Sequence, residues 1–266
     1  MKTRMPAIFI GHGSPMNAIS HNAYTESLAA QASAMPRPAA VLVVSAHWMT
    51  PGTRVTAAPA PRQIYDFSGF PDELYRVQYA PQGDPSVAAR AVGLLSAAGL
   101  HEPAADPSRG IDHAAWAVLI HMYPDASVPV LELSLDYRNH PKDFFALGAA
   151  LAPLREEGIL ILGSGNIVHN LSAFEFDTDA PAYPWAKEFD ERFKDRVARG
   201  DREALASFAL PVEMSKLAVP TPEHYLPALA VLGCAGEGDR LRYFHESIQN
   251  ASISMRCFAV ETADRV

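Results

Sequence analysis

The sequence is poor in cysteine and in basic residues, and each shortage excludes a class of protein. Its two cysteines, Cys234 and Cys257, form no CxxC pair in 266 residues. We therefore expect no disulfide framework, zinc cluster or redox pair. We expect both cysteines to be buried thiols in a reducing compartment. Lys and Arg number 22 against 30 Asp and Glu, for a net charge of −8. Because phosphate binding needs a basic surface, neither nucleic acid nor an anionic membrane is expected as a partner.

Long apolar runs are also missing. No stretch approaches the roughly 18 uncharged apolar residues of a membrane span. The charged start is followed by an apolar run from Ala7 to only Ile10, which is shorter than the about 7 to 15 residues of a secretory signal. We therefore expect a cytoplasmic protein with no membrane partner. Nothing in the sequence indicates its oligomeric state.

The common nucleotide and hydrolase signatures are absent. Gly163-Ser-Gly165 lacks the third glycine of a dinucleotide fingerprint and the Gly-Lys-Thr/Ser end of a P-loop, and no GxSxG elbow surrounds Ser14 or Ser164. A nucleotide enzyme or a serine hydrolase is therefore not expected. We expect glycines such as Gly11 and Gly165 to let the backbone approach a metal or a substrate closely.

The sequence does contain short apolar runs separated by helical patterns. Continuous rather than alternating hydrophobicity is typical of strands that are covered on both faces. The predicted strands are 7–10, 40–45, 128–135, 158–162 and 252–260. The predicted helices are 23–34, 86–98, 113–122, 142–155, 184–199 and 222–232, three of them closed by Gly99, Gly200 and Gly233. This alternation predicts one α/β domain over residues 1–266, with a mostly parallel central sheet flanked by helices.

The segment from Pro51 to Pro81 is the least regular part of the chain. It includes the aromatic stretch Tyr65 to Tyr75. Long loops inside compact domains are usually functional, so we expect this one to form a wall or lid over a site. Phe67, Phe70 and Tyr75 are then candidates for holding a flat ring, although they would serve equally well to pack the loop onto the sheet.

Three of the ten histidines follow predicted strands. His12 comes after the first run, His47 after the second, and His169 a few residues after the run that ends at Leu162. In open parallel sheets, ligands bind beyond the carboxyl ends of the strands, so these side chains are expected to converge there. A lone histidine is more often structural than a ligand, but three in parallel positions favour a metal site.

Two further histidines stand at predicted helix starts. His224 occupies the first turn of the helix expected from Pro222, and His113 heads another helix after Asp112. Asp112 is expected to cap that helix, while His113 can reach the same crevice as an acid or base. The other histidines have no such setting and are expected to be surface or packing residues. They are His21, His101, His121, His140 and His245.

Six motifs together resemble the 4,5-DOPA dioxygenase extradiol family, which is related to the catalytic subunit of protocatechuate 4,5-dioxygenase. They span residues 11 to 227 in order and cover nearly the whole chain. They are Gly11-His-Gly-Ser-Pro-Met-Asn17, Ser45-Ala-His-Trp48, Asp66-Phe-Ser-Gly-Phe-Pro71, Gly110-Ile-Asp-His113, Gly163-Ser-Gly-Asn-Ile-Val-His-Asn170 and Glu223-His-Tyr-Leu-Pro227.

The resemblance implies a catechol-opening dioxygenase with a non-haem metal. It maps His12, His47 and His224 onto metal ligands, His169 onto a residue that completes or adjoins the metal shell, and His113 onto the pocket wall. The related protocatechuate enzyme uses two histidines and a glutamate, whereas the pattern here favours His224 over its neighbour Glu223. The implied metal is Fe(II), and an all-histidine shell also suits Zn(II).

The implied reaction opens a catechol, such as 3,4-dihydroxyphenylalanine, with O₂ to a muconate semialdehyde-type product. Because a catechol hydroxyl must lose its proton, a histidine is the natural acid/base. His169 is the first choice because it is nearest the expected metal ligands, and His113 is the second. Two alternatives remain open: a zinc-dependent hydrolase or lyase with Asp112 or Glu223 as its base, and a non-enzymatic metal-binding protein that acts through interaction.

Overall fold

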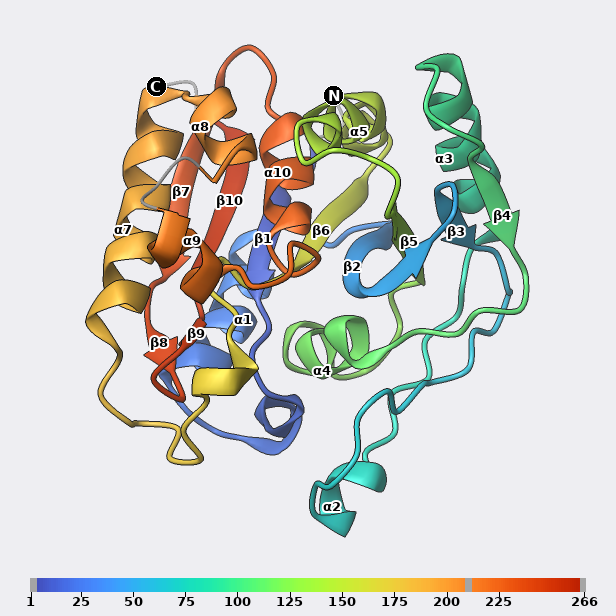
Figure 1. Ribbon diagram of the computed structural model, residues 1–266. Coiled ribbons are helices and arrows are strands. Elements are labelled where there is room, and N and C mark those ends of the chain that lie inside the picture. The colour runs from blue at the N-terminus through green and yellow to red at the C-terminus, as the bar shows by residue number, and fades with distance from the viewer. Residues whose placement is uncertain (1–3, 209–211, 264–266) are drawn as a thin grey trace.

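A central eight-stranded sheet organises the protein (Figure 1). The computed structural model describes residues 4–208 and 212–263, so the outermost residues of the predicted domain lie outside the described part. In spatial order the strands run β4-β3-β5-β2-β6-β1-β10-β7. Their bounds are β1 (Ala7–Gly11), β2 (Ala40–Thr50), β3 (Arg54–Thr56), β4 (Ala104–Asp106), β5 (Val130–Asp136), β6 (Ile159–Gly165), β7 (Asp239–His245) and β10 (Cys257–Thr262). A separate hairpin pairs β8 (Ile248–Gln249) with β9 (Ile253–Ser254).

The middle of the sheet is parallel, which confirms the predicted fold class. β2 pairs in parallel with both β5 and β6, and β6 pairs in parallel with β1. Antiparallel pairs lie toward the two edges, where β10 joins β1 and β7, and β3 joins β5. The carboxyl ends of the parallel strands therefore meet at one edge of the sheet.

The continuous apolar runs of the central strands are explained by cover on both faces. In β1, Ala7 and Phe9 enter one hydrophobic core while Ile8 and Ile10 enter the other. β2 and β6 alternate in the same way. Because successive side chains of a strand point to opposite faces, a strand buried on both faces must be apolar throughout.

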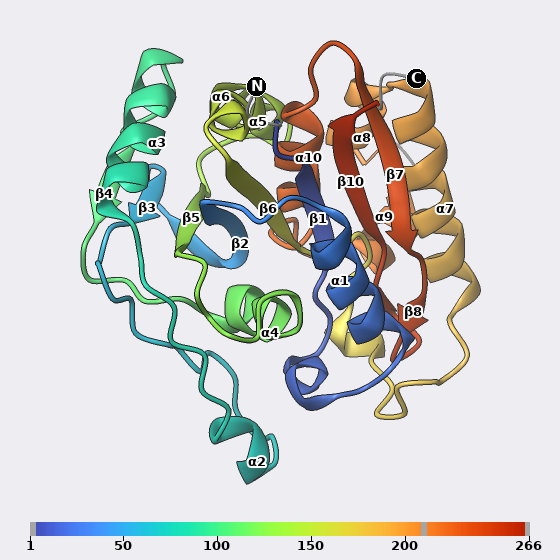
Figure 2. The same ribbon diagram turned by 180° about the vertical axis from the view of Figure 1, so that it is seen from behind.

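Helices supply that cover (Figure 2). One core includes side chains from α1 (Ala23–Ala34) and α4 (His113–Met122). The other includes side chains from α3 (Pro85–Ala97), α5 (Asp143–Leu151), α7 (Pro184–Arg199) and α10 (Leu226–Gly233). Shorter helices connect these elements. They are α2 (Asp72–Tyr75), α6 (Pro153–Glu156), α8 (Arg202–Ala206), α9 (Val212–Ala218) and the 3-10 helices η1 (Pro15–Ile19) and η2 (Leu171–Ala173).

Three predicted helices have different bounds in the structure. The helix expected over 86–98 is displaced by one residue, because α3 spans Pro85–Ala97. The helix expected over 142–155 is divided, because α5 ends at Leu151 and α6 begins at Pro153, whose ring cannot continue a helix from the preceding turn. The helix expected from Pro222 begins only at Leu226, and Gly233 belongs to α10 rather than stopping it. A Cβ at Gly233 would lie 2.2 Å from the Phe145 carbonyl oxygen. This glycine therefore allows α10 to pack closely against α5.

The irregular segment after β2 holds little regular structure, as expected. Between β3 and α3 it contains only α2 among the described helices and strands, and it extends beyond the carboxyl edge of the sheet (Figure 1). Leu74 of α2 is fully buried and belongs to the core beneath α4. This burial anchors the far end of the segment. Among the described helices, none has the length and apolar character needed to cross a membrane.

Candidate active site

His12 stands directly beyond β1, as predicted. Its backbone N–H donates to the carbonyl oxygen of Gly165 at 3.0 Å, which extends the parallel pairing of β1 with β6 by one residue. The side chain is 4% exposed. The end of the strand ladder thus fixes the first histidine of the site.

His47 does not follow a strand, contrary to the prediction, but lies within β2. On the side that faces β5, Val44 pairs with Leu133 and Met49 with Leu135, so four residues of β2 oppose Ser134 alone. Such a bulge bends the strand and re-aims its side chains. The backbone N–H of His47 donates to Ser45 Oγ at 3.1 Å, which holds the bulge closed. The predicted strand ended at Ser45 because the apolar run ends there, and the sequence does not indicate that β2 continues to Thr50.

His224 lies in the turn before α10. Its carbonyl oxygen accepts a hydrogen bond from the backbone N–H of Asn166 at 2.8 Å. A Cβ at Gly165 would lie 2.0 Å from that carbonyl oxygen, so the glycine at the end of β6 is what permits the approach. The glycine was predicted to bring the backbone close to a metal or a substrate, and the close contact seen here is with the backbone of His224.

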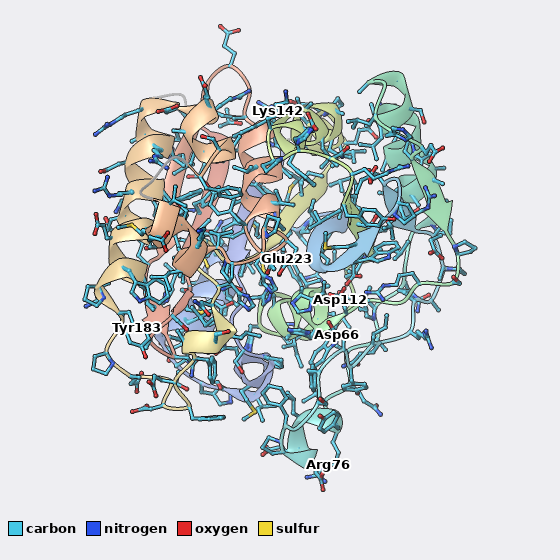
Figure 3. The ribbon with its side chains drawn as sticks, viewed as in Figure 1. Asp66, Arg76, Asp112, Lys142, Tyr183 and Glu223 are labelled. Atoms are coloured by element: carbon cyan, nitrogen blue, oxygen red, sulfur yellow. The ribbon has the colours of Figure 1, made fainter. Side chains whose placement is uncertain are left out.

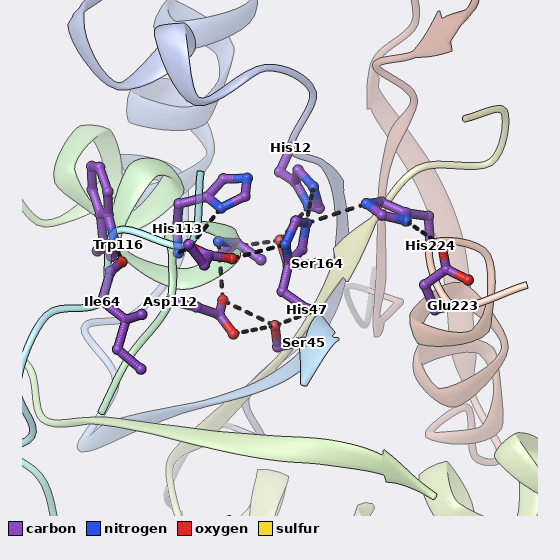
Figure 4. Close-up of polar contacts among 12 residues, drawn as sticks. His12, Ser45, His47, Ile64, Asp112, His113, Trp116, Ser164, Glu223 and His224 are labelled. Carbon is purple, nitrogen blue, oxygen red and sulfur yellow. Dashed lines mark hydrogen bonds and ion pairs between the residues drawn. The ribbon is translucent and has the colours of Figure 1, made fainter. Parts of the chain in front are cut away.

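The Nε2 atom of His47 lies between those of His12 and His224 and close to both (Figure 4). His47 Nε2 lies 3.3 Å from His12 Nε2 and 3.2 Å from His224 Nε2. Nitrogens that share a metal ion at about 2.1 Å lie about 3.0 to 3.4 Å apart at octahedral or tetrahedral angles. The spacing therefore fits three donors of one metal shell.

The other ring nitrogen of each histidine has a hydrogen-bond acceptor that fixes the tautomer. His47 Nδ1 lies 2.9 Å from Asp66 Oδ2, and His224 Nδ1 lies 3.1 Å from Glu223 Oε1. His12 Nδ1 lies 3.0 Å from Ser164 Oγ, whose own hydroxyl donates to the Ala114 carbonyl oxygen. Each Nδ1 therefore carries the proton, and each Nε2 directs a lone pair at the others.

Three convergent lone pairs repel one another unless a cation lies among them. A proton on one Nε2 relieves a single contact, whereas a metal ion accepts all three lone pairs at once. Protonated Nδ1 atoms that donate to carboxylate or hydroxyl oxygens are also the usual support of metal-bound histidines. The donor set thus fits a divalent transition metal held by nitrogen.

Asp66 connects the cluster to a fourth histidine. Its Oδ1 accepts hydrogen bonds from His113 Nδ1 at 2.8 Å and from the His113 backbone N–H at 3.0 Å, while Oδ2 accepts from His47. His113 is 4% exposed, and its ring centroid lies 4.2 Å from that of His47. No role could be assigned to Asp66 from the sequence, because its position in an irregular loop does not reveal that both carboxylate oxygens face the cluster.

Asp112 and Glu223 act as supports of the surrounding structure. Asp112 is fully buried and caps α4 through the Ala114 backbone N–H, as predicted, and it also accepts hydrogen bonds from Ser45 and Arg109. Glu223 accepts from Thr221 Oγ1 as well as from His224. Neither Asp112 nor Glu223 (labelled in Figure 3) is among the described residues that line the cavity, although each is the chain neighbour of a lining histidine, His113 or His224. This weakens the hydrolase alternative, in which one of them would face the substrate.

His169 lies against the ring of His224. The two rings stack with centroids 3.6 Å apart and planes 7° from parallel. The backbone N–H of His169 donates to the Ala218 carbonyl oxygen at 2.9 Å, which holds the segment after β6 against the end of α9. Ligand atoms of His169, Glu223 and His224 lie within 4.8 Å of one another. His169 is therefore close enough to adjoin a metal shell built on His224.

Burial dominates the protonation of the cluster. It lowers the pKa of His12 well below the usual value, that of His224 to about 4 and that of His169 to about 2. Burial also lowers the pKa of His113, against the opposing effect of Asp66. At His47 burial is outweighed by the hydrogen bond to Asp66 and by nearby carboxylates, so the pKa is raised. Burial alone would raise the pKa of Asp66, but its hydrogen bonds to His113 and His47 lower that pKa by more. The net pKa lies below the usual value, so this carboxyl stays ionised.

A cavity of about 390 Å³ opens onto these rings. Its size is typical of a small-molecule site. Phe67 and Phe70 line it, as predicted, but Tyr75 is not among the described residues of the lining, and its ring packs 5.3 Å from that of Phe67 instead. Leu171, Phe174 and Ile253 complete the apolar wall. The sequence did not single them out, because they come from segments whose contact depends on tertiary packing.

The remaining histidines lie outside the described lining of this cavity. His121 Nε2 contacts the Asn17 carbonyl oxygen at 2.7 Å, and His245 Nε2 contacts Ser247 Oγ at 2.7 Å. His101 Nδ1 accepts from Arg138 on the surface. These contacts agree with the packing and surface positions expected for them.

Comparison with known proteins gives a consistent result. Residues 6–260 match the family model described as the catalytic LigB subunit of aromatic ring-opening dioxygenase. A protein of Escherichia coli K12 named 4,5-DOPA dioxygenase extradiol is 44% identical over 256 residues, which cover 95% of this chain and 93% of that protein. A Beta vulgaris protein of the same name is 37% identical, with 90% of each chain covered. The crystal structure of an uncharacterized Escherichia coli K12 protein superimposes with a TM-score of 0.83 and 40% identity, covering 97% of this chain and 100% of that one.

Proposed function

The chain belongs to the LigB family of aromatic ring-opening dioxygenases and is an extradiol dioxygenase, and from this premise we propose its substrate, its metal and the roles of its residues. The substrate is a catechol such as 3,4-dihydroxyphenylalanine, in keeping with the names of the relatives. The ring bond beside the diol breaks, both atoms of O₂ enter the product, and a muconate semialdehyde-type compound results.

His12, His47 and His224 hold the metal through Nε2. The observation that carries this assignment is the meeting of three Nε2 lone pairs at 3.2 and 3.3 Å, with each Nδ1 already committed to an acceptor. The metal is Fe(II), because zinc offers the same coordination but no redox chemistry. When bound there, Fe(II) would supply the redox chemistry that makes O₂ reactive toward the ring.

His169 is the acid/base. Its ring stacks on His224 and lines the cavity, so it lies beside a diol bound at the metal ligands and can exchange the proton of a catechol hydroxyl. His113 faces the same cavity on the other side, with Nδ1 held by Asp66 and Nε2 left to hold the second hydroxyl of the diol. The two histidines thus orient the diol between them.

The apolar wall binds the ring and excludes water. Phe67 and Phe70 come from the loop before α2, and Phe174 and Leu171 come from the segment after β6. Aromatic side chains contact a flat substrate ring through their edges or faces. Burial of the substrate ring against these side chains favours its transfer from water into the cavity.

Anaerobic loading with Fe(II), followed by oxygen-electrode measurements with several catechols, tests this function. We expect stoichiometric O₂ uptake and a yellow ring-opened product. Protein loaded with Zn(II) serves as the control and should consume no O₂. Absence of uptake with every catechol, together with hydrolysis by the zinc form, would instead support the metal-dependent hydrolase.

The cytoplasm is the proposed location. Cys234 and Cys257 are both free and fully buried, which suits a compartment in which thiols remain reduced. Cell fractionation with antibodies against the protein tests this location, and recovery from an extracytoplasmic fraction would contradict it.

A further inference from the structure

A second cavity adjoins the first one. It measures about 410 Å³ and shares Ser14, Phe70 and Phe174 with the wall of the histidine pocket. Its remaining lining comes from η1 and the residue after it, from the loop before α2, from the segment between η2 and α7, and from the β8–β9 hairpin. A molecule bound over the histidines can therefore extend past the two phenylalanines into this second chamber.

The second chamber differs from the first in character. Ser, Thr, Asn and Gln side chains contribute much of its wall, and none of its 13 lining residues carries a formal charge. Such a wall forms hydrogen bonds without favouring a net charge of either sign. An isolated carboxylate or ammonium placed there would lose hydration without gaining an ion pair.

Two buried amides leave matched polar groups in this chamber. Asn17 Nδ2 donates to the His12 carbonyl oxygen and to Gln249 Oε1, each at 3.2 Å. The carbonyl of His12 can only accept, so it fixes the orientation of Asn17, and Asn17 in turn fixes that of Gln249. Asn17 Oδ1 and Gln249 Nε2 consequently have no partner among the described residues, although Asn17 is only 5% and Gln249 only 8% exposed.

Gln249 is held firmly in this position. It ends β8, and the next two residues, Asn250 and Ala251, have φ of 52° and 61°, a left-handed turn that side chains other than glycine adopt at a cost. Backbone N–H groups of Glu175 and Tyr183 donate to the carbonyl oxygens of Asn250 and Ala251. These bonds hold the backbone beside Gln249 in place, and the hydrogen bond from Asn17 orients its side chain.

We infer that the second chamber is the specificity subsite of the enzyme, in which Gln249 and Asn17 recognise a ring substituent that is neutral overall and carries both donors and acceptors. A zwitterionic α-amino acid group has this chemistry. Its carboxylate accepts from Gln249 Nε2, and its ammonium group donates to Asn17 Oδ1. The inference rests on the proposed function, because it requires a catechol over the histidines.

Steady-state kinetics with four catechols test this subsite: 3,4-dihydroxyphenylalanine, 4-methylcatechol, dopamine and 3,4-dihydroxyphenylacetate. For the wild-type enzyme we expect kcat/KM to be at least about 10-fold higher for the zwitterion than for each of the other three, as one or two hydrogen bonds to charged groups allow. Equal values for all four would overturn the subsite while leaving ring opening intact. Failure to open any of them would overturn the proposed function itself.

A substitution at Gln249 provides the second test. Gln249→Glu keeps the acceptor for Asn17 and replaces the free donor by a carboxylate oxygen. We expect the ratio of kcat/KM for 3,4-dihydroxyphenylalanine over dopamine to fall by at least about 10-fold. The matched control is Gln82→Glu, because the Gln82 side chain is exposed, and there the ratio should not change. An unchanged ratio in Gln249→Glu would contradict the inference.

Binding without turnover gives a third measurement. Calorimetry on the zinc-loaded protein compares the Kd of 3,4-dihydroxyphenylalanine with that of 4-methylcatechol. We expect tighter binding of the zwitterion to the wild type and loss of that advantage in Gln249→Glu. Equal Kd values in the wild type would contradict the subsite even if Gln249→Glu failed to fold.

Discussion

His169 stacks face to face on His224, with ring centroids 3.6 Å apart. The two residues come from the segment after β6 and from the turn before α10, so the stack joins two distant parts of the chain. A residue placed in this way can serve the site by its nitrogen atoms or simply by its flat ring. Substitutions separate these two contributions.

His169→Phe keeps an aromatic ring and removes the nitrogens. If His169 is the acid/base, kcat should fall by about 10² to 10⁴ because proton transfer is lost, while iron content remains at one per chain. Oxygen uptake and metal analysis of the same sample check this. The control is His21→Phe, at an exposed position, which should match the wild type. Loss of iron together with activity would identify His169 as a ligand instead.

Asp66→Asn tests the carboxylate that His47 and His113 share. An amide oxygen accepts from one histidine, but the amide nitrogen cannot accept from the other, so one imidazole loses its fixed tautomer. Loss of such support commonly weakens metal affinity by about 10- to 100-fold. Competition with a chelator measures this affinity. Asp72→Asn on the exposed start of α2 should leave it unchanged, and an unaltered affinity in Asp66→Asn would mean that Asp66 does not support the metal.

Arg256→Met tests a buried ion pair. The fully buried guanidinium donates to Asp190 through Nε and Nη2 and to Glu191 through Nη2. Removing it leaves a buried carboxylate without its cation, which should lower the free energy of unfolding by about 3 to 5 kcal/mol. Urea unfolding measures the loss. Arg192→Met breaks an exposed pair with Glu188 and should change stability by less than about 1 kcal/mol. Equal effects of the two variants would contradict this interpretation.

Glu132→Gln tests a buried carboxyl on β5. Burial raises the pKa of Glu132 well above 4.5, and the nearby Asp112 raises it further, against the weaker effect of Arg109. Because the folded state then binds a proton more tightly than the unfolded state, the wild type loses stability as the pH rises above 4.5 toward the folded pKa. Glutamine has no such titration.

The free energy of unfolding of Glu132→Gln, relative to the wild type, should therefore increase with pH. One linked proton gives a slope of at most about 1.4 kcal/mol per pH unit. Urea unfolding between about pH 5 and 8 measures it, with Glu237→Gln at an exposed site as the control. Parallel curves for Glu132→Gln and the wild type would show that Glu132 is ionised in both states.

Much of the fold could be predicted because local signals agree with the tertiary structure. The observed bounds of α1, α4 and α7 coincide residue for residue with the predicted ones. Asn22 and Asp112 cap the first two helices through side-chain oxygens, and Gly200 closes the third in the left-handed conformation. β7 gave no such signal. It is an edge strand that contains Arg240 and Arg242. Charged residues on an edge strand discourage pairing with other chains, and they also interrupt the apolar run by which a strand is predicted.

The candidate site was predictable where a side chain follows directly from the end of an element. His12 after β1 is the clearest case. His47 was correctly expected near the carboxyl ends of the strands, but it was wrongly expected to follow a strand. It lies within a bulge of β2 that becomes visible only in the pairing with β5. Asp66, Asn17 and Gln249 could not be assigned roles, because their importance lies in hydrogen bonds to residues far away in the sequence.

The meeting of His12, His47 and His224 also bears on the stability of the protein. His47 is separated from its two neighbours by 35 and 177 positions along the chain. A metal ion held by all three would join β1, β2 and the start of α10 in the folded protein and have no such site in the unfolded chain. Ion binding and folding would then be thermodynamically linked, so the midpoint of thermal unfolding should rise with the concentration of free metal.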